Sequence, residues 1–294
     1  MASSADETHV GEVSVDAVVV GTDGSDEALR AVAWAARGAA VMKRTLVIVH
    51  AWVWPLYNID LGPVSGIKDS GLQRAAERVL EEAEAEARKT APEIKISTRL
   101  VVGRAGDKLA EASRDANLVV VADRGLGGFL GLLLGSTSLR LVTGSHAPVL
   151  LVRGADHDGG PVVAGVDGSA ESDLAVQRAA ELADFTGNSL NLIHVDRLGA
   201  YQSDAVSEDG EPAEMLEKAV QIAKQTAPSI EVSSSVVSAK SAPKALIDAS
   251  ETARIIVVGS RGSSQFAGPL GSTTHALLQH AKCPVLCAVA PKSD

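Results

Sequence analysis

The feature that most constrains this chain is an internal duplication, because its second half repeats the first in the same order. VVVGTDGSDEALRAVAWAA at residues 18–36 returns as VVAGVDGSAESDLAVQRAA at residues 162–180, and LGSTS at 134–138 returns as LGSTT at 270–274. Solenoid repeats have periods of roughly 20–50 residues, whereas this repeat spans about half of the 294 residues. We therefore expect two related domains rather than a repeat array.

The repeat also sets the domain boundaries. We expect a flexible tail at residues 1–15, a first domain at 16–153, a linker at 154–160 and a second domain at 161–291. The linker, GADHDGG, is polar and glycine-rich and has no hydrophobic periodicity. The tail is polar and acidic, and it has no apolar stretch of the kind that a signal peptide needs.

Within each copy, short apolar runs alternate with helical patterns. In the first copy we expect strands at residues 16–21, 45–51, 95–103, 118–122 and 147–152, with a helix in each interval. Ser25 is placed to cap the first of these helices, which should end near Met42. Strict alternation of strand and helix predicts an α/β fold, with a doubly wound, five-stranded parallel sheet in each domain.

Composition and charge exclude several classes of partner. An apolar fraction of 46% with only 3% aromatic residues suits buried parallel strands covered by alanine-rich helices. The net charge of −10 argues against bulk binding to nucleic acid or anionic lipid. The strongly apolar run within the leucine-rich stretch ADRGLGGFLGLLLGSTS at 122–138 is far short of the roughly 18 apolar residues that span a bilayer. We therefore expect neither a nucleic-acid partner nor a membrane partner.

The two cysteines, Cys283 and Cys287, lie on one expected strand, CPVLC. Four residues of strand span roughly 13 Å, whereas a disulfide needs Cα atoms within about 7 Å. We expect two buried thiols rather than a disulfide or a metal site, which fits a reducing cytoplasm.

In doubly wound sheets, ligands bind beyond the carboxyl ends of the strands. The residues that follow the first strand are Gly21, Thr22 and Asp23 in the first copy and Gly165, Val166 and Asp167 in the second. Each aspartate either forms an Asx turn that caps the next helix or contributes to a binding site. His50 and His194, near the ends of the second strands, are more typical of packed or capped residues.

The loop after the fourth strand has the same plan in both copies, with Arg-Gly first and Gly-Ser-Thr at the start of a helix. A helix N-terminus of small residues offers free N–H groups and a positive dipole end to an anion such as phosphate. The candidates are Arg124, Gly125, Gly135, Ser136 and Thr137 in the first copy and Gly259, Arg261, Gly262, Gly271, Ser272 and Thr273 in the second.

Familiar motifs of other classes are absent. A dinucleotide fingerprint starting at Gly125 would need glycine at Leu130, and no Gly-Lys pair exists for a P-loop. Neither the G-x-S-x-G motif of hydrolases nor the H-E-x-x-H motif of zinc enzymes occurs.

Together these residues resemble the universal stress protein family in its tandem, two-domain form. ATP-binding members of that family carry G-x2-G-x9-G-[ST] after strand four and an aspartate after strand one. In the first copy, nine residues (126–134) separate Gly125 from Gly135, but Ala122 stands where the motif has its first glycine. In the second copy, eight residues (263–270) separate Gly262 from Gly271.

The resemblance implies a flavodoxin-like, adenine-nucleotide-binding fold and ATP in each domain, with Mg²⁺ between the phosphates and no dedicated protein ligand for the metal. Asp23 and Asp167, with the backbone of Ala51 and Val195, would lie near the nucleoside. The glycines and hydroxyls of the loops would hold the phosphates. Asp123, which follows Ala122, would weaken ATP binding if its carboxylate pointed inward, because like charges repel.

Three functions stay open on the sequence. The first is an ATP-binding stress-response or regulatory protein without catalysis beyond slow ATP hydrolysis. The second is an enzyme on the same scaffold. Such an enzyme would need a general base or a lysine near the loops, and no such residue repeats in the two copies. The third is a nucleotide-free interaction module. We also expect the two domains to pack on each other through the free edge of a last strand, and a further homodimer is an open alternative.

Overall fold

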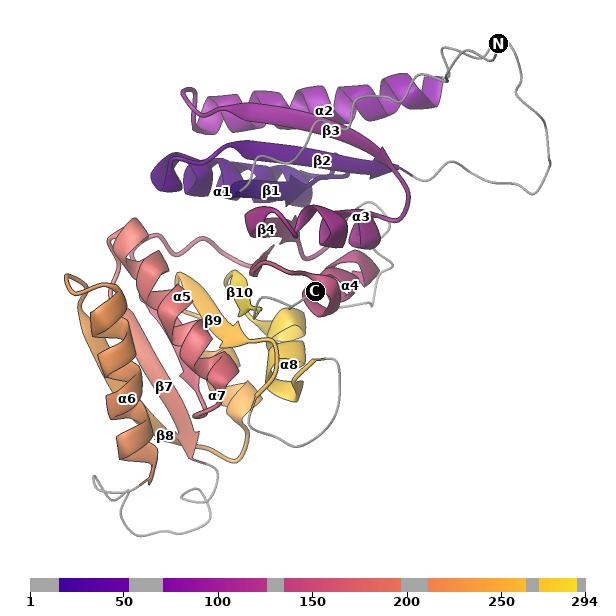
Figure 1. Ribbon diagram of the computed structural model, residues 1–294. Helices are drawn as coiled ribbons and strands as arrows, with labels where there is room; N and C mark the ends of the chain where they lie inside the picture. Colours follow the sequence, from indigo (N-terminus) through magenta and orange to yellow (C-terminus); the bar gives the residue numbers. More distant parts are fainter. Residues whose placement is uncertain (1–15, 53–70, 126–134, 197–210, 263–269, 290–294) are drawn as a thin grey trace, which may run out of the picture.

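The computed structural model of the protein describes residues 16–52, 71–125, 135–196, 211–262 and 270–289 (Figure 1). The first half contains β1 (Ala17–Gly21), α1 (Asp26–Met42), β2 (Leu46–Trp52), α2 (Gly71–Thr90), β3 (Ile96–Val102), α3 (Ala105–Ala112), β4 (Ala116–Ala122), α4 (Ser136–Gly144) and β5 (Val149–Val152). The second half contains β6 (Val162–Val166), α5 (Ala170–Thr186), β7 (Leu190–Asp196), α6 (Glu211–Thr226), β8 (Val232–Ser238), α7 (Ala242–Ala249), β9 (Ile255–Gly259), α8 (Ser272–His280) and β10 (Val285–Ala288).

The ten described strands form one sheet in the order β3-β2-β1-β4-β5-β10-β9-β6-β7-β8. All pairs within each half are parallel. The central pair, β5 with β10, is antiparallel and places Leu151 opposite Val285. The predicted fold, two tandem α/β domains with a five-stranded parallel sheet each, is confirmed. Figure 1 shows the first half, indigo to magenta, beside the second half, orange to yellow.

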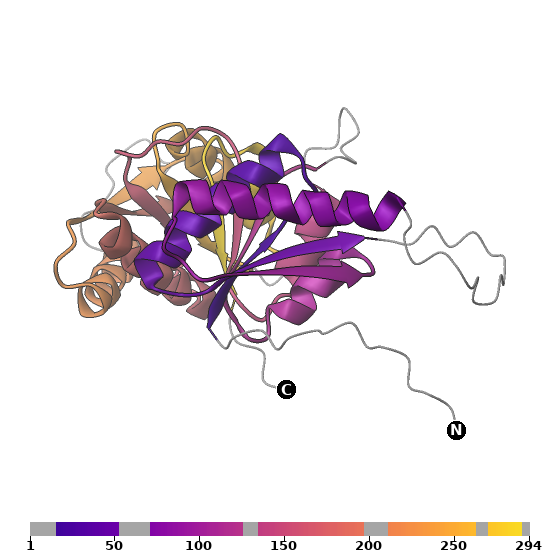
Figure 2. The ribbon, with the colours of Figure 1, turned by 90° about the horizontal axis from the view of Figure 1, so that it is seen from above.

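Helices cover both faces of the sheet and give two hydrophobic cores. On one face, alanine-rich α1 and α5 pack beside α2 and α6, and Figure 2 shows the long helix α2 running along the strands of the first half. On the other face, α3, α4, α7 and α8 contribute leucines to a second cluster. Small alanine side chains let the helices lie close to valine-rich strands that are buried on both faces.

Local sequence signals explain where the first helix of each half begins. Ser25 caps α1, and its side chain accepts a hydrogen bond from the N–H of Ala28. Ser169 caps α5 by accepting from the N–H of Ser172. The expected start at Ser25 and end at Met42 are both observed. These caps turn the chain sharply after β1 and β6, so the residues of each turn stay at the carboxyl edge of the sheet.

Residues 154–160, expected to be a linker, lie against the second half. The N–H of Ala155 donates to the carbonyl of Lys282 at 2.9 Å. The Asn188 side chain donates to the carbonyls of Asp158 and Gly160, each at 3.0 Å. Hydrogen bonds therefore hold the segment that connects β5 to β6 against the second half. The expected tail at residues 1–15 lies outside the described residues.

Both cysteines are buried free thiols, as expected. Burial raises the pKa of Cys283 and of Cys287 to about 12, because a thiolate is poorly solvated between the sheet and its helices. In the native protein at pH 8 we therefore expect no reaction of either thiol with Ellman's reagent on the time scale of minutes, since the thiolate is the nucleophile. After unfolding in guanidinium chloride, both thiols should react. Fast native reaction would contradict their burial.

Across the part of the chain that the structure describes, no helix has the length and apolar character required to cross a bilayer.

Candidate functional site

A cavity of about 290 Å³ lies in the first domain, at the carboxyl ends of β1, β2 and β4. The first turns of α3 and α4 close it from the other side. Every site residue that the sequence predicted for the first copy lines this cavity: Gly21, Thr22, Asp23, Ala51, Arg124, Gly125, Gly135, Ser136 and Thr137. Residues more than 100 positions apart in the sequence are thus brought to one hollow.

Asp23 forms the Asx turn that the sequence offered as one alternative, and it also lines the cavity. Its Oδ1 accepts hydrogen bonds from the Ser25 N–H at 3.1 Å and from the Ser25 hydroxyl at 2.7 Å, which is an Asx turn. Its Oδ2 faces Gly125, where a Cβ atom would collide with the carboxylate. The Asx turn therefore fixes the orientation of a carboxylate that lines the cavity, and only glycine fits beside it at position 125.

The N-terminus of α4 forms the polar wall of the cavity. Gly135 is the N-cap, and among the described residues no side-chain hydrogen bond caps the helix, in contrast to Ser25 at α1. Uncapped N–H groups in a first helical turn favour an anion, and the helix dipole adds to this preference. The Ser138 hydroxyl donates to the carbonyl of Ala122 at 3.2 Å, which ties the start of α4 to the end of β4.

Another part of the cavity lining is apolar. Val49, Leu109 and Val121 form it, and Leu109 packs so closely on β1 that a Cβ at Gly21 would lie 2.7 Å from its Cδ1. A flat apolar group fits such a wall better than a charged one. The cavity lining therefore combines an apolar part with a helix N-terminus that favours an anion.

Asp123 also lines the cavity and is only 4% exposed. Its carboxylate lies 3.8 Å from Nε of Arg153 and 3.6 Å from Nε of Arg124. Burial lowers the pKa of the Arg153 guanidinium, and the charge of Asp123 opposes that shift. Two arginines thus offset the negative charge of Asp123, which would otherwise disfavour binding of an anion.

Arg153 connects this site to the second domain. It follows β5, and its Nη1 donates to the carbonyls of Leu277 and Leu278 in α8, at 3.1 and 2.8 Å. In the repeat, Ser260 stands at the position of Asp123 and Val289 at the position of Arg153. The ion pair therefore occurs in the first domain, whereas the second domain has uncharged residues at both positions.

The second domain repeats the arrangement around its aspartate. Asp167 Oδ1 accepts from the N–H and the hydroxyl of Ser169, at 3.1 and 2.6 Å. A Cβ at Gly262 would lie 2.5 Å from Asp167 Oδ2, as at Gly125 in the first domain. The Thr274 hydroxyl donates to the carbonyl of Gly259 at 2.7 Å, in the role that Ser138 has in the first domain.

Helix α8 matches α4 at its start, with Gly271 as N-cap and no side-chain cap from the part of the chain that the structure describes. The N–H of Gly271 donates to the carbonyl of Ser260 at 2.9 Å, as that of Gly135 does to Asp123 at 3.3 Å. The remaining predicted residues of this domain lie at the ends of β6, β7 and β9 or at the start of α8: Gly165, Val166, Val195 and Arg261 at the strand ends, and Ser272 and Thr273 in the first turn of the helix. The two domains thus share the same local arrangement of the aspartate, the glycines and the helix start.

Comparison with known proteins identifies the fold. A sequence model of the universal stress protein family matches residues 15–153 and 160–288. The chain belongs to the universal stress protein family. It is similar to a universal stress protein of Mycobacterium tuberculosis, at 30% identity with 98% of each chain covered. A second such protein from the same organism is 32% identical, with 92% of this chain and 95% of the relative covered.

A solved structure of a universal stress protein from Archaeoglobus fulgidus has the same fold, with a TM-score of 0.69 and 24% identity. The match covers 93% of this chain and 98% of the other. The two-domain arrangement expected for this universal stress protein is thus supported along nearly its whole length.

Some residues of this universal stress protein lie differently from the expectation. Ala51, expected as the last residue of the second strand, lies inside β2, and Val195 lies at the equivalent position inside β7, each one residue before its strand ends. These strands run longer because β3 and β8 pair with them as far as Trp52 and Asp196. The leucine-rich residues 126–134 and most of the shorter loop of the second copy, residues 263–269, lie outside the described residues.

The two histidines contact the backbone of the turns, and the two loop arginines are exposed. His50 Nδ1 lies 2.8 Å from the carbonyl of Thr22, and His194 Nδ1 lies 2.8 Å from that of Val166, so both support the turn after the first strand. The Arg124 and Arg261 side chains are more than 60% exposed. Within the described ranges no group of three or more His, Cys, Asp or Glu residues could hold a metal ion.

Sequence reasoning missed part of the site. The apolar wall of Val49, Leu109 and Val121 gave no signal beyond ordinary core periodicity. A signal did exist for Ser138 and Thr274, because a hydroxyl follows Gly-Ser-Thr in both copies. The partnership of Asp123 with Arg153 had only an indirect signal, namely that both positions change together between the two copies.

Proposed function

We propose that this universal stress protein binds ATP in the cavity of the first domain and at the equivalent strand ends of the second. The observation that supports this most strongly is the convergence of all nine predicted residues of the first copy on one cavity. That cavity has an apolar wall, an oriented carboxylate and an uncapped helix N-terminus, the three features that a base, a ribose and a phosphate chain need.

In this proposal each part of the nucleotide has a place. The adenine lies on Val49, Leu109 and Val121, and the ribose hydroxyls donate to the carboxylate of Asp23. The phosphates accept hydrogen bonds from the first turn of α4, with the hydroxyls of Ser136 and Thr137 as further donors. Mg²⁺, where it accompanies ATP, is held by the phosphates and water, and it supplies charge neutralisation.

The role we propose is regulatory, with the nucleotide as a ligand. The described lining residues include no histidine or lysine, and both lining carboxylates are engaged: Asp123 is paired with arginines, and Asp23 accepts two hydrogen bonds from Ser25. Slow hydrolysis of ATP remains compatible with this role. We further propose that the β5–β10 pair keeps the two domains together in solution and that the protein acts in the cytoplasm.

Isothermal titration calorimetry of the full chain with ATP and Mg²⁺ tests the proposal. We expect two bound ATP molecules per chain, and weaker binding of adenosine because it lacks the phosphates that contact α4 and α8. Release of phosphate followed in the same sample would reveal an enzyme. Absence of heat at millimolar ATP would overturn the proposal and favour the nucleotide-free interaction module.

A further inference from the structure

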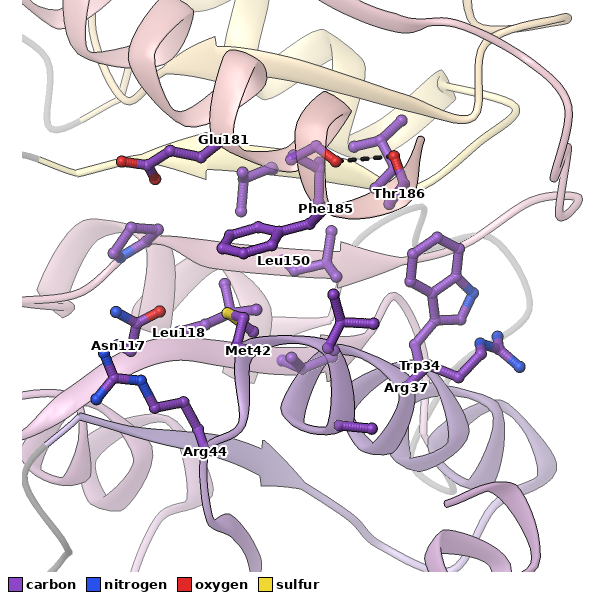
Figure 3. A pocket seen from close by; sticks show the side chains of 18 of the residues that line it. Trp34, Arg37, Met42, Arg44, Asn117, Leu118, Leu150, Glu181, Phe185 and Thr186 are labelled. Carbon is purple, nitrogen blue, oxygen red and sulfur yellow. Dashed lines mark hydrogen bonds between the residues drawn. The ribbon is translucent and has the colours of Figure 1, made fainter. Parts of the chain in front are cut away.

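A second and larger cavity, of about 650 Å³, lies between the two domains and shares no lining residue with the candidate ATP cavity. Helices α1 and α5 form its two walls, and strands β4, β5, β9 and β10 form its floor (Figure 3). The lining is mainly apolar, and Val41 and Phe185 on the two walls are 51% and 46% exposed. Exposed apolar surface costs free energy in water, so a segment that covers these side chains is stabilised there.

The linker lies across one end of the cavity, which Figure 3 shows at Trp34 and Arg37. Asp156 of the linker pairs with Arg37 at 3.4 Å. Arg254, whose guanidinium lies 5.5 Å from the ring centroid of Trp34, donates to the carbonyl of Asp158 at 2.6 Å. The segment that precedes β6 is therefore bonded to the residues that line this end.

The segment that precedes β1 meets the other end of the cavity, which Figure 3 shows at Arg44 and Asn117. The Arg44 side chain donates to the carboxylate of Asp16 at 2.8 Å. The N–H of Asp16 donates to the carbonyl of Asp115 at 2.8 Å, close to Asn117 in the sequence. Because Arg44 and Asn117 line the cavity, residues 1–15 join the described chain at its rim.

The repeat relates the two ends of the cavity to each other. In the aligned copies, Asp16 corresponds to Gly160 and Arg44 corresponds to Asn188. The Asn188 side chain donates to the carbonyl of Gly160 at 3.0 Å, and Arg44 likewise donates to Asp16. The same position therefore holds the chain before the first strand of each half. By this correspondence, residues 10–15 are the counterpart of the linker that crosses the other end.

A buried donor in the cavity lining lacks an acceptor. Arg178 of α5 pairs with Glu181 at 2.8 Å, and Figure 3 shows Glu181 at the same end as Arg44. Nε of Arg178 is buried and has no hydrogen-bond partner among the described residues. Buried polar groups in native proteins are nearly always hydrogen-bonded. A backbone carbonyl of a segment that crosses this end would supply the acceptor.

Residues 10–15, VGEVSV, have the composition and the length that the cavity requires. All four lining arginines already pair with carboxylates, so an occupant needs apolar side chains and carbonyls rather than a further charge. The stretch contains three valines, and Val13 and Val15 share one face of an extended segment. Six extended residues reach about 20 Å, whereas α1 from Trp34 to Met42 runs about 12 Å along the cavity.

We propose that residues 10–15 lie in this cavity, with Val13 and Val15 against the exposed side chains of Val41 and Phe185 and a backbone carbonyl at Nε of Arg178. The segment belongs to the first domain and α5 belongs to the second. It therefore joins the domains through a contact that is independent of the β5–β10 pair. ATP neither requires nor displaces the segment, because the two cavities share no lining residue.

Hydrogen exchange of the full chain, followed by mass spectrometry, tests the placement. The amides of residues 10–15 should exchange about tenfold or more slower than those of a free peptide of the same sequence. Val41→Ser removes an apolar side chain from the cavity wall and should bring the exchange close to that of the peptide. Val102→Ser, at a side chain that is 62% exposed and outside the cavity lining, is the matched control and should retain the protection. Exchange at the peptide rate in the wild-type chain, or equal exchange in both variants, would overturn the proposal.

A variant in the segment itself gives a second readout. Val13→Asp should release the segment and increase the fluorescence of 8-anilinonaphthalene-1-sulfonate, because a carboxylate is poorly tolerated on an apolar wall. Ala5→Asp adds the same charge outside the docked stretch and should leave the fluorescence unchanged. Equal fluorescence of the two variants would overturn the proposal. Protection of residues 10–15 that is lost on dilution, with a dimeric mass in light scattering, would also overturn it and assign the cavity to a second copy of the chain.

Discussion

The Ser136→Asp variant is expected to lose ATP from the first domain, with about a thousandfold lower affinity and no loss of stability. Ser136 is the first residue of α4 and lines the cavity where the phosphates are proposed to lie. A carboxylate about 4 Å from a phosphate costs about 4 kcal/mol at an effective dielectric constant of 20. The same carboxylate stabilises a helix N-terminus by about 0.3–1 kcal/mol, so binding and stability should change in opposite directions.

Calorimetry of this variant should show one ATP per chain instead of two, and thermal unfolding should show an unchanged or slightly higher Tm. Ser272→Asp should have the same effect on the second domain, because Ser272 begins α8 in the same way. Lys89→Gln changes the net charge by the same amount at a side chain that is 79% exposed, and it serves as the control. Two ATP molecules bound to Ser136→Asp would contradict the placement of the phosphates.

The Arg153→Val variant is expected to be destabilised by about 3 kcal/mol, because it leaves the buried carboxylate of Asp123 without its buried partner. The variant also removes the two hydrogen bonds to the carbonyls of α8. For a chain of this size, we expect Tm to fall by roughly 6–12 °C. ATP binding to the first domain should weaken as well, since Asp123 lines that cavity.

The double variant Asp123→Ser, Arg153→Val carries the residues of the second copy at both positions and should recover most of the lost stability. Replacing both members of a buried ion pair is far less costly than removing one. Arg140→Val, which breaks an exposed pair with Asp107, is the control and should cost less than about 1 kcal/mol. If the single and double variants unfold at the same temperature, the unpaired carboxylate is not the cause.

Local chemistry in the sequence was sufficient to locate the edge of the sheet that holds the site. The cap at Ser25, the turn at Asp23 and the helix start at Gly135 each depend on neighbours within a few residues. Alternating strands and helices then bring these segments to one edge, because the carboxyl ends of parallel strands lie together. Because the chain is duplicated, the cap, the turn and the helix start each occur a second time in the second half.

The specific contacts between the domains could not be predicted from the sequence. Arg153 contacts carbonyls of α8 more than 120 positions away, and that contact depends on the antiparallel register of β5 with β10. Free strand edges indicate that pairing is available, but they do not specify the register or the spacing of α1 and α5.

We propose that ATP binds at the carboxyl ends of the strands in each domain, and a crystal structure of the full chain with ATP and Mg²⁺ would show the ligand in place. We expect a triphosphate at the N-terminus of α4, with the ribose at Asp23 and the adenine against Leu109, and the same arrangement at α8 and Asp167. Nucleotide bound elsewhere, or no nucleotide at millimolar ATP, would contradict it.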